Sequence, residues 1–287
     1  MPPKSVNPLQ FLTDARVVIV AGKGGVGKTT VTAVVARAAN DQGLRVLVVE
    51  LDGKPTLKAL LGHDIPCLAL TPAAALAEYL DTHGLGRVAK RLATSGVIEV
   101  VATAAPGIDD IVVLGKIKQL EQSGNYDLIV VDGPAAGHAI TFLMAPANLL
   151  KLVRGGPIHS QAIDVAEMLK DPARSQVVLV TLPETTPVNE VIETAHALRN
   201  DGGLKLGPVV VNAFDEGDDL PVDLAEVGSS LRAAAEFRNA RRSLHRRESQ
   251  RLGEALDLEQ IRLPLMPLQA LDSDSIEQLA SRLGLKS

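Results

Sequence analysis

Short runs of apolar, mostly β-branched residues recur along this chain, and each is followed by a longer stretch whose apolar residues stand three or four positions apart. The short runs are typical of strands, and the longer stretches are typical of crossover helices. The expected strands cover 16–21, 46–51, 127–131, 176–182, 208–212 and 261–265. Because the first five each contain at least three consecutive Val, Ile or Leu residues, we expect both of their faces to be buried. The pattern predicts an α/β fold, a three-layer sandwich with a mostly parallel central sheet flanked by helices.

Helical spacing is clearest at 28–42, where Gly43 supplies a stop, and near the C-terminal end of the sequence. The apolar positions are Val31, Val34, Val35 and Ala38 in the first stretch, and Ile276, Leu279, Ala280 and Leu283 in the second. We interpret the second stretch as a closing helix packed on the sheet rather than a membrane-binding helix, because it is short and carries few basic residues. Loops are expected at 154–157 and in the acidic run 215–219.

Composition narrows the classes of function. The chain has 287 residues, 46% of them hydrophobic, which is enough for one large domain with a sizeable core. With two Tyr, four Phe and no Trp, the core is expected to be aliphatic, and recognition of bases by aromatic stacking is disfavoured. The net charge of -5 argues against a nucleic-acid or anionic-membrane surface. No apolar stretch approaches the roughly 18 residues of a membrane span, and residues 1–4 lack the apolar region of a secretory signal. We therefore expect a cytoplasmic protein without a transmembrane segment.

A glycine-rich segment follows the first predicted strand directly and reads GKGGVGKTT over 22–30. It satisfies GxxxxGK[ST] between a strand and a helix, which is the context of a nucleotide-binding phosphate loop. Glycines let successive backbone N–H groups turn toward phosphate oxygens, and the N-terminal end of the following helix adds positive charge. Lys28 is expected to reach the β and γ phosphates, and the Thr29 hydroxyl is expected to be a Mg²⁺ ligand. The expected nucleotide-binding residues of the loop are Gly22, Gly24, Gly25, Val26, Gly27, Lys28, Thr29 and Thr30.

Lys23 occupies a position that is free in a plain phosphate loop, so on its own it is also compatible with a solvated surface charge. Together with 24–30 it resembles the deviant Walker A loop, KGGVGKTT. The family with that loop includes ParA and MinD, the nitrogenase iron protein, and the arsenite-pump and tail-anchored-protein-targeting ATPases. In that family the first lysine crosses a dimer interface to the partner's nucleotide. The resemblance implies a nucleotide-sandwich dimer in which Lys23 acts catalytically in trans, like an arginine finger.

Two carboxylates, Glu50 and Asp52, stand at the end of the second predicted strand. A carboxylate beside the phosphate loop at a strand's C-terminal end lies where α/β sheets bind ligands, and it can orient water or magnesium. By the resemblance, Asp52 is the catalytic switch I aspartate that positions the attacking water, with Glu50 as a partner behind it. The alternative is an ordinary acidic residue at a strand end. The relatives continue this switch as DPAxN, whereas this chain reads DGKPT.

The segment from Tyr126 to Pro146 carries the most specific resemblance. It begins YDLIVVDGPAAGH. This is similar to the YDxxxxDxxPxGH switch II of the arsenite-pump and tail-anchored-targeting branch, except that Pro134 stands one position early. Asp132 ends a buried strand and is expected to hold Mg²⁺ through water, as a Walker B carboxylate does. His138 is expected on a loop that responds to the γ phosphate, as a hydrogen-bonding residue rather than a metal ligand.

Three further segments extend the resemblance along the chain: PGIDD at 106–110, the Pro-Glu pair at 183–184 and Val-Val-Asn at 210–212. The last is similar to the strand end that recognises adenine in this branch. The Asn212 amide can both donate to and accept from a purine edge, which suits ATP. Pro264 and Leu265, at the end of the last predicted strand, are expected to line the same adenine pocket.

The single cysteine separates this chain from two branches that it resembles. Cys67 alone permits no internal disulfide and no CxxC zinc site. Arsenite-pump subunits bind metalloid through several cysteines, and some tail-anchored-targeting relatives clamp their dimer with zinc. The resemblance therefore implies the ATP machinery without an arsenite or a zinc site.

We expect one P-loop ATPase domain over 1–287, with a helical insertion around 58–120 that contains helices near 74–79 and 85–92. The insertion either holds a protein client or only covers the sheet. Met-rich client binding has little support, because only Met144 and Met168 fall where such helices would lie. The segments 97–105, 115–118 and 155–159 most resemble actinobacterial ATPases of this branch. Some of those pair with a paralogue, so a homodimer and a heterodimer both stay open.

A basic run covers 232–251, with seven arginines against Glu236 and Glu248. Most such runs are solvated helix faces. The alternative is a docking surface for an acidic partner.

The sequence therefore predicts an enzyme first: a Mg²⁺-dependent ATPase that hydrolyses ATP within a dimer and so switches the binding of an unidentified protein partner. A second hypothesis is a nucleotide-gated binding scaffold with little hydrolysis, motivated by the irregular switch after Asp52. A third, a ParA- or MinD-like positioning protein on DNA or membrane, is disfavoured by the net charge of -5.

Overall fold

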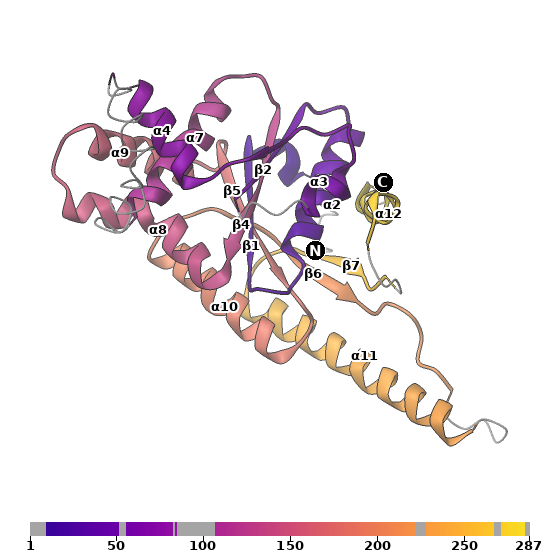
Figure 1. The fold of residues 1–287 in the computed structure, drawn as a ribbon. Coiled ribbons are helices and arrows are strands. Elements are labelled where there is room, and N and C mark those ends of the chain that lie inside the picture. Colours follow the sequence, from indigo (N-terminus) through magenta and orange to yellow (C-terminus); the bar gives the residue numbers. More distant parts are fainter. Residues whose placement is uncertain are drawn as a thin grey trace, which may run out of the picture.

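A parallel sheet forms the middle layer of the molecule (Figure 1). The structure is a computed structural model that describes residues 10–51, 56–82, 84, 107–221, 228–266 and 271–284, with the side chains of 135–137 left out. Within these residues the sheet has seven strands in the order β3-β2-β4-β1-β5-β6-β7, and every paired neighbour is parallel. The strands are β1 (Val17–Gly22), β2 (Val46–Glu50), β3 (Cys67–Ala69), β4 (Leu128–Ala135), β5 (Ser175–Thr181), β6 (Leu206–Phe214) and β7 (Gln260–Pro264).

Helices cover both faces of this sheet, which confirms the predicted three-layer α/β sandwich (Figure 1). One face carries α1 (Phe11–Asp14), α2 (Lys28–Asp41), α3 (Thr56–Leu61) and α12 (Ser273–Gly284). The other carries α4 (Pro72–Thr82), α7 (Ile108–Gln122), α8 (Ala136–Leu152), α9 (Pro157–Lys170), α10 (Thr185–Asn200) and the C-terminal end of α11 (Ser229–Ala255). None of the helices among the described residues is both long and apolar enough to cross a membrane.

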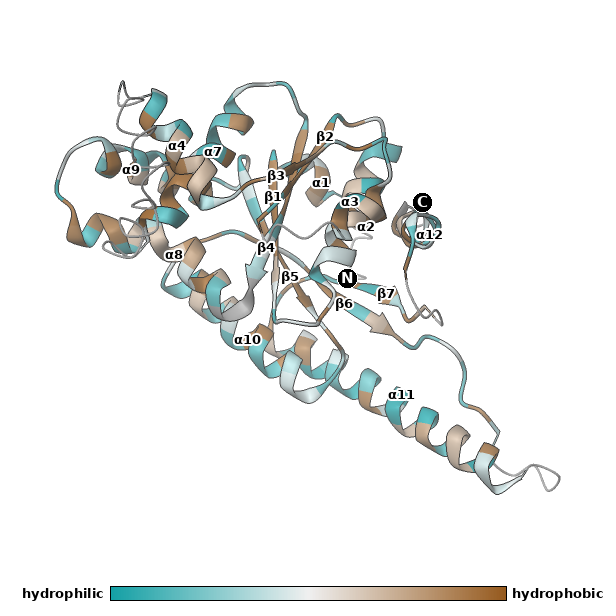
Figure 2. Ribbon diagram, in the orientation of Figure 1, coloured by the Kyte–Doolittle hydropathy of each residue, from teal (hydrophilic) through white to brown (hydrophobic). Residues whose placement is uncertain are grey.

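Alternation along the strands divides the core into two halves. In β1, Val17 and Ile19 pack into the half under α7, α8 and α10, whereas Val18 and Val20 pack into the half under α2 and α12. Every residue of β1, β2 and β5 is buried, as the continuous apolar runs predict for interior strands. Strands β1 and β2 are accordingly brown in the middle of Figure 2.

Five of the predicted strands lie within two residues of the observed bounds, and β4 continues four residues beyond the predicted end. The structure adds one strand that the pattern did not predict. This is β3, which has three residues, lies at the edge of the sheet and is only partly buried. A run that short carries too little alternation to be separated from a loop.

The two helices with the clearest spacing are confirmed. Helix α2 ends one residue before the predicted bound, and Gly43 beyond it has a φ of +84° that favours glycine at a helix stop. Helix α12 packs on α2, with Ile276 and Leu279 buried, so it closes the sandwich as predicted. The predicted helix at 74–79 lies within α4, while 85–92 falls outside the described residues. The proposed insertion at 58–120 and the single domain stay predictions; the described part of the insertion holds β3 as well as helices.

Candidate functional site

The phosphate loop joins β1 to α2 at the carboxyl edge of the sheet, where parallel strands place their ligands. Gly22 is the last residue of β1, and a Cβ there would overlap the Val180 carbonyl oxygen of β5. Gly27 is the N-cap of α2 and has a φ of +90°, which is costly for any residue with a Cβ. Val26 between them is buried under the sheet. The predicted glycine loop is therefore held tightly at both ends, directly before a helix N-terminus that attracts phosphate.

Asn212 on β6 braces this loop. Its Nδ2 donates a hydrogen bond of 2.9 Å to the Val26 carbonyl oxygen, across 186 positions of sequence. A Cβ on Gly27 would overlap the same nitrogen. One of the two N–H donors of the Asn212 amide is thus used by the loop, and its predicted contact with a purine stays a prediction.

The two predicted magnesium residues lie against each other. The Thr29 hydroxyl donates to Asp132 Oδ2 over 2.8 Å, and Asp132 is buried at 8% exposure. Hydroxyl and carboxylate oxygens are suitable ligands for Mg²⁺. This ion is usually bound by only one or two protein carboxylates, and water and phosphate oxygens complete its coordination shell. A hydroxyl and a carboxylate side by side at the end of a phosphate loop therefore fit Mg²⁺.

Thr32 is a site residue that the sequence analysis missed. Its hydroxyl donates to Asp132 Oδ1 over 3.1 Å, so both carboxylate oxygens are held from α2. Thr32 stands three residues after Thr29, on the same helix face, and this spacing could have identified it as a site residue from the sequence. Glu50 lies opposite Asp132 in the β2–β4 register and is buried. The expected place of Glu50 behind Asp52 stays a prediction, because Asp52 is outside the described residues.

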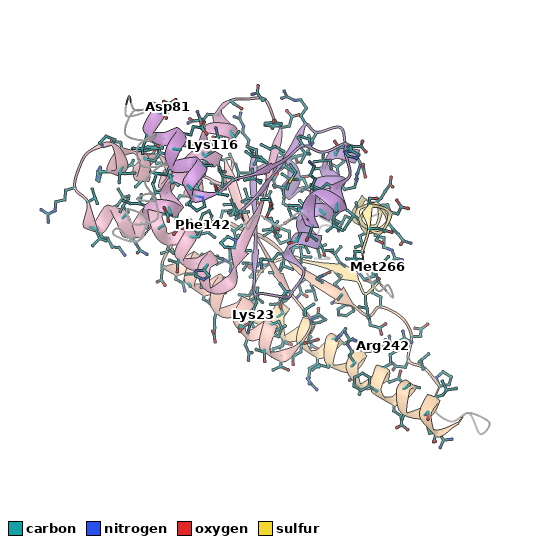
Figure 3. All side chains as sticks on the ribbon, in the orientation of Figure 1. Lys23, Asp81, Lys116, Phe142, Arg242 and Met266 are labelled. Atoms are coloured by element: carbon teal, nitrogen blue, oxygen red, sulfur yellow. The ribbon has the colours of Figure 1, made fainter. Side chains whose placement is uncertain are left out.

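Both lysines of the loop contact the chain's own oxygens. Lys28 Nζ donates to the Lys23 carbonyl oxygen over 3.2 Å. Lys23 Nζ forms an ion pair with Glu190 of α10. Figure 3 labels Lys23 at the sheet edge beside that helix. The sequence offered no signal for Glu190, because 167 residues separate the pair.

A cavity of about 620 Å³ opens at the carboxyl ends of β6 and β7. The predicted adenine-pocket residues Pro264 and Leu265 both line it. Its other lining residues are Phe214, Asp215, Glu216, Gly217, Arg238, Met266, Gln278 and Arg282. A purine with its ribose is small enough for this volume, and the mixture of apolar and charged walls is typical of ligand pockets.

The acidic loop and the basic helix noted in the sequence bind each other. Arg238 on α11 donates two hydrogen bonds of 3.0 Å to Asp215, and these hold the pKa of that carboxyl below its usual value. Arg242 and Arg246 both pair with Asp219. This forms one wall of the cavity, because Asp215 and Arg238 line it.

Two further arginines of the run, Arg247 and Arg251, pair with Glu248 on the same helix. Five of the seven arginines therefore meet carboxylates of their own chain. These five arginines share three carboxylates, Asp215, Asp219 and Glu248, so the pairing reduces the positive charge of the run without cancelling it. The run also differs from a plain solvated face, because Arg242 is buried.

The second predicted switch leaves the sheet at the same edge, because it follows β4. Asp52, together with 53–55, is outside the described residues, so its catalytic role stays a prediction. His138 lies on α8 with an exposed side chain. It lines a cavity of about 230 Å³ with Asp110 of α7 and with Phe142, which Figure 3 labels. Burial raises the pKa of Asp110, and neighbouring Asp109 adds to that rise.

Comparison with known proteins agrees with this geometry. Residues 17–227 match the family model described as the CobQ/CobB/MinD/ParA nucleotide binding domain. The chain is 33% identical over 239 residues to the ATPase BagA of Mycobacterium tuberculosis. The alignment covers 75% of this chain and 70% of that protein. It is 28% identical over 211 residues to the arsenical pump-driving ATPase of Escherichia coli, covering 70% of this chain and 35% of that protein. It is also 25% identical to the ATPase ARSA1 of Chlamydomonas reinhardtii over 269 residues, covering 69% of this chain and 34% of the relative.

Proposed function

We propose that this chain is a Mg²⁺-dependent ATPase of the arsenite-pump and tail-anchored-targeting type. The proposal starts from its family, because the chain belongs to the CobQ/CobB/MinD/ParA nucleotide-binding domain family. It hydrolyses ATP within a nucleotide-sandwich dimer, formed with a second copy or a paralogue, and so switches the binding of a protein client. The observation that carries the proposal is the contact between Thr29 and Asp132 at the end of the phosphate loop, where a hydroxyl and a buried carboxylate lie 2.8 Å apart.

Each residue has a distinct part in this reaction. Backbone N–H groups of the loop and the N-terminus of α2 bind the phosphates, and Lys28 neutralises charge on the γ phosphate. Thr29 and Asp132 would hold Mg²⁺, which when bound neutralises charge that develops between the β and γ phosphates. Asp52 orients the attacking water. Lys23 of the partner subunit completes the neutralisation, and Pro264 and Leu265 enclose the adenine.

Replacing Asp52 by asparagine is expected to lower turnover by about 10²–10³-fold while leaving ATP affinity within about threefold, because the change acts on the water and not on the phosphates. Phosphate release at saturating Mg²⁺-ATP and equilibrium binding of a fluorescent ATP analogue measure the two quantities. Asp41→Asn, at an exposed position at the end of α2, is the matched control and should leave both unchanged. Turnover at the wild-type level in Asp52→Asn would show that another group positions the water.

Replacing Lys23 by alanine is expected to impair both ATP-driven dimerisation and hydrolysis, the latter by at least about tenfold, because the proposed trans cation is removed. Sedimentation velocity with and without a non-hydrolysable ATP analogue reports the dimer, and phosphate release reports turnover. Lys170→Ala, an exposed lysine at the end of α9, is the control. A fully active protein that stays monomeric with nucleotide would rule out the sandwich.

The rival proposal is a nucleotide-gated scaffold with negligible hydrolysis. The DGKPT sequence that follows the second strand favours it, because the relatives have DPAxN there. Both proposals require ATP to change the oligomeric state. They differ in phosphate release, which the scaffold lacks when it is fully dimeric with Mg²⁺-ATP.

A further inference from the structure

Lys23, the residue proposed to act on the partner's nucleotide, is held by a carboxylate of its own subunit. Its ammonium forms an ion pair with Glu190 in the second turn of α10. The Lys23 side chain is 46% exposed and that of Glu190 is 32% exposed. The pair therefore lies at the surface of the sheet edge, where the lysine can leave the carboxylate without unfolding α10.

The Glu190 carboxylate depends on this lysine. One oxygen accepts from Lys23, while the other is buried and accepts no hydrogen bond from any residue that the structure describes. A buried carboxylate oxygen without a donor is costly, so the nearby positive charge is its main compensation. The backbone around it is fixed, since the Thr194 hydroxyl donates to the Glu190 carbonyl oxygen over 2.7 Å.

The cavity beside Lys23 and Glu190 is too small for a bound anion to hold the two side chains together. The cavity lined by Lys23, Glu190, Pro187 and Thr194 has a volume of about 10 Å³. That volume holds at most one water molecule and no phosphate group. Glu190 thus does not share Lys23 with a bound anion at this place.

We propose that Glu190 is a latch that holds Lys23 within its own subunit and so weakens the ATP-bound dimer that two subunits form. The inference rests on the proposed sandwich dimer. The cavity of about 10 Å³ beside the pair has no room for a phosphate group, so Lys23 has to leave Glu190 to reach the γ phosphate of a partner, and closure requires both latches of a dimer to open. The latched subunit is a binding-incompetent state, and the apparent dissociation constant of the dimer rises with its population. Glu190 acts through Lys23 and is therefore a positioning residue.

The test compares Glu190→Gln with wild type by sedimentation velocity across a protein dilution series in the presence of Mg²⁺ and a non-hydrolysable ATP analogue. Glutamine keeps the shape and removes the charge. Exposed ion pairs are weak, and two of them open for each dimer, so the variant is expected to dimerise roughly three- to tenfold more tightly. Glu193→Gln, an exposed position three residues along the same helix, is the matched control and should not change the dimer.

Two further readouts separate a latch from a structural role. On a Lys23→Ala background, Glu190→Gln should have no effect on dimerisation, because nothing is left to release. Raising the salt concentration should shrink the difference between wild type and Glu190→Gln, because the exposed pair is screened. Thermal unfolding of each variant verifies that it is folded.

The outcomes distinguish the latch from the dimer. If wild type and Glu190→Gln both stay monomeric with nucleotide, the sandwich and the latch are both wrong. If wild type dimerises and Glu190→Gln dimerises equally well or less well, only the latch is wrong, and Glu190 then has no effect or helps Lys23 to reach its target. Tighter dimerisation that persists without Lys23 also contradicts the latch.

Discussion

Replacing Asp132 by asparagine is expected to lower ATP turnover by about 10²–10³-fold, the usual loss when one charge-stabilising group of a reaction site is removed. The carboxylate accepts hydrogen bonds from Thr29 and Thr32 on its two oxygens. Asparagine keeps the shape, but it carries no charge and presents an NH₂ group toward one of these hydroxyls. We therefore expect weaker Mg²⁺ binding together with the slower reaction. Phosphate release measured across a Mg²⁺ titration at constant ATP reports both effects.

A residue next to the same strand supplies the control for this prediction. Asp127 directly precedes the N-terminal end of β4, where Arg45 pairs with it and holds its pKa at about 2. Asp127→Asn also removes a carboxylate charge that is paired in the structure, but at the edge of the sheet away from the phosphate loop. Its turnover is expected to stay within about twofold of wild type. Equal losses in the two variants would mean that any charge change on β4 disturbs the protein, and the metal role of Asp132 would be wrong.

Replacing Gly27 by alanine is expected both to destabilise the protein and to weaken nucleotide binding. The backbone φ of +90° costs a residue with a Cβ about 1–2 kcal/mol. The added methyl group would also overlap the Asn212 amide nitrogen and displace its hydrogen bond to the Val26 carbonyl, a further loss of about 1 kcal/mol. The free energy of unfolding should fall by roughly 2–3 kcal/mol, and ATP affinity should fall at least about tenfold. Urea unfolding and equilibrium binding of an ATP analogue measure these changes.

Gly24 is the matched position within the same loop. Beyond its two chain neighbours, a Cβ on Gly24 would meet no atom of the described residues within 4 Å, and its φ is outside the left-handed region. Gly24→Ala is therefore expected to change the free energy of unfolding by less than about 0.5 kcal/mol. If both variants lose the same stability, the Asn212 brace does not explain the requirement for glycine at position 27.

Much of the fold was predictable because its signals are local. Runs such as 46–49 and 177–180 are apolar at every position, as expected for strands that are buried on both faces. The helical stretches between the strands indicate crossover connections, which join parallel strands. The signal of the phosphate loop is local as well, since its glycines, lysine and threonine lie in one short stretch of sequence. The strand β3 was missed because three residues at a sheet edge hold too little pattern.

The candidate site was predictable only in part. Lys28, Thr29 and Asp132 were identified from motifs, and the structure places Thr29 and Asp132 in contact. Pro264 and Leu265 were expected at a pocket and line a cavity. By contrast, the acidic run at 215–219 was predicted only to be a loop, and the arginines of α11 were read as a separate charged face. That Arg238 and Asp215 form one wall of the cavity depends on how β6 and α11 pack.

Local patterns in the sequence specify the sheet, the phosphate loop and the residue types for nucleotide chemistry, because each of these requires a pattern within a few neighbouring positions. Which side chains contact each other across the fold depends on the tertiary packing. Asn212 reaches the loop across 186 positions, and Glu190 reaches Lys23 across 167. The partner of a charge or an amide at such separations is set by the crossovers that bring the end of β6 and the first turns of α10 close to the loop after β1. No local periodicity records that choice, and so the brace and the proposed latch come from the packing alone.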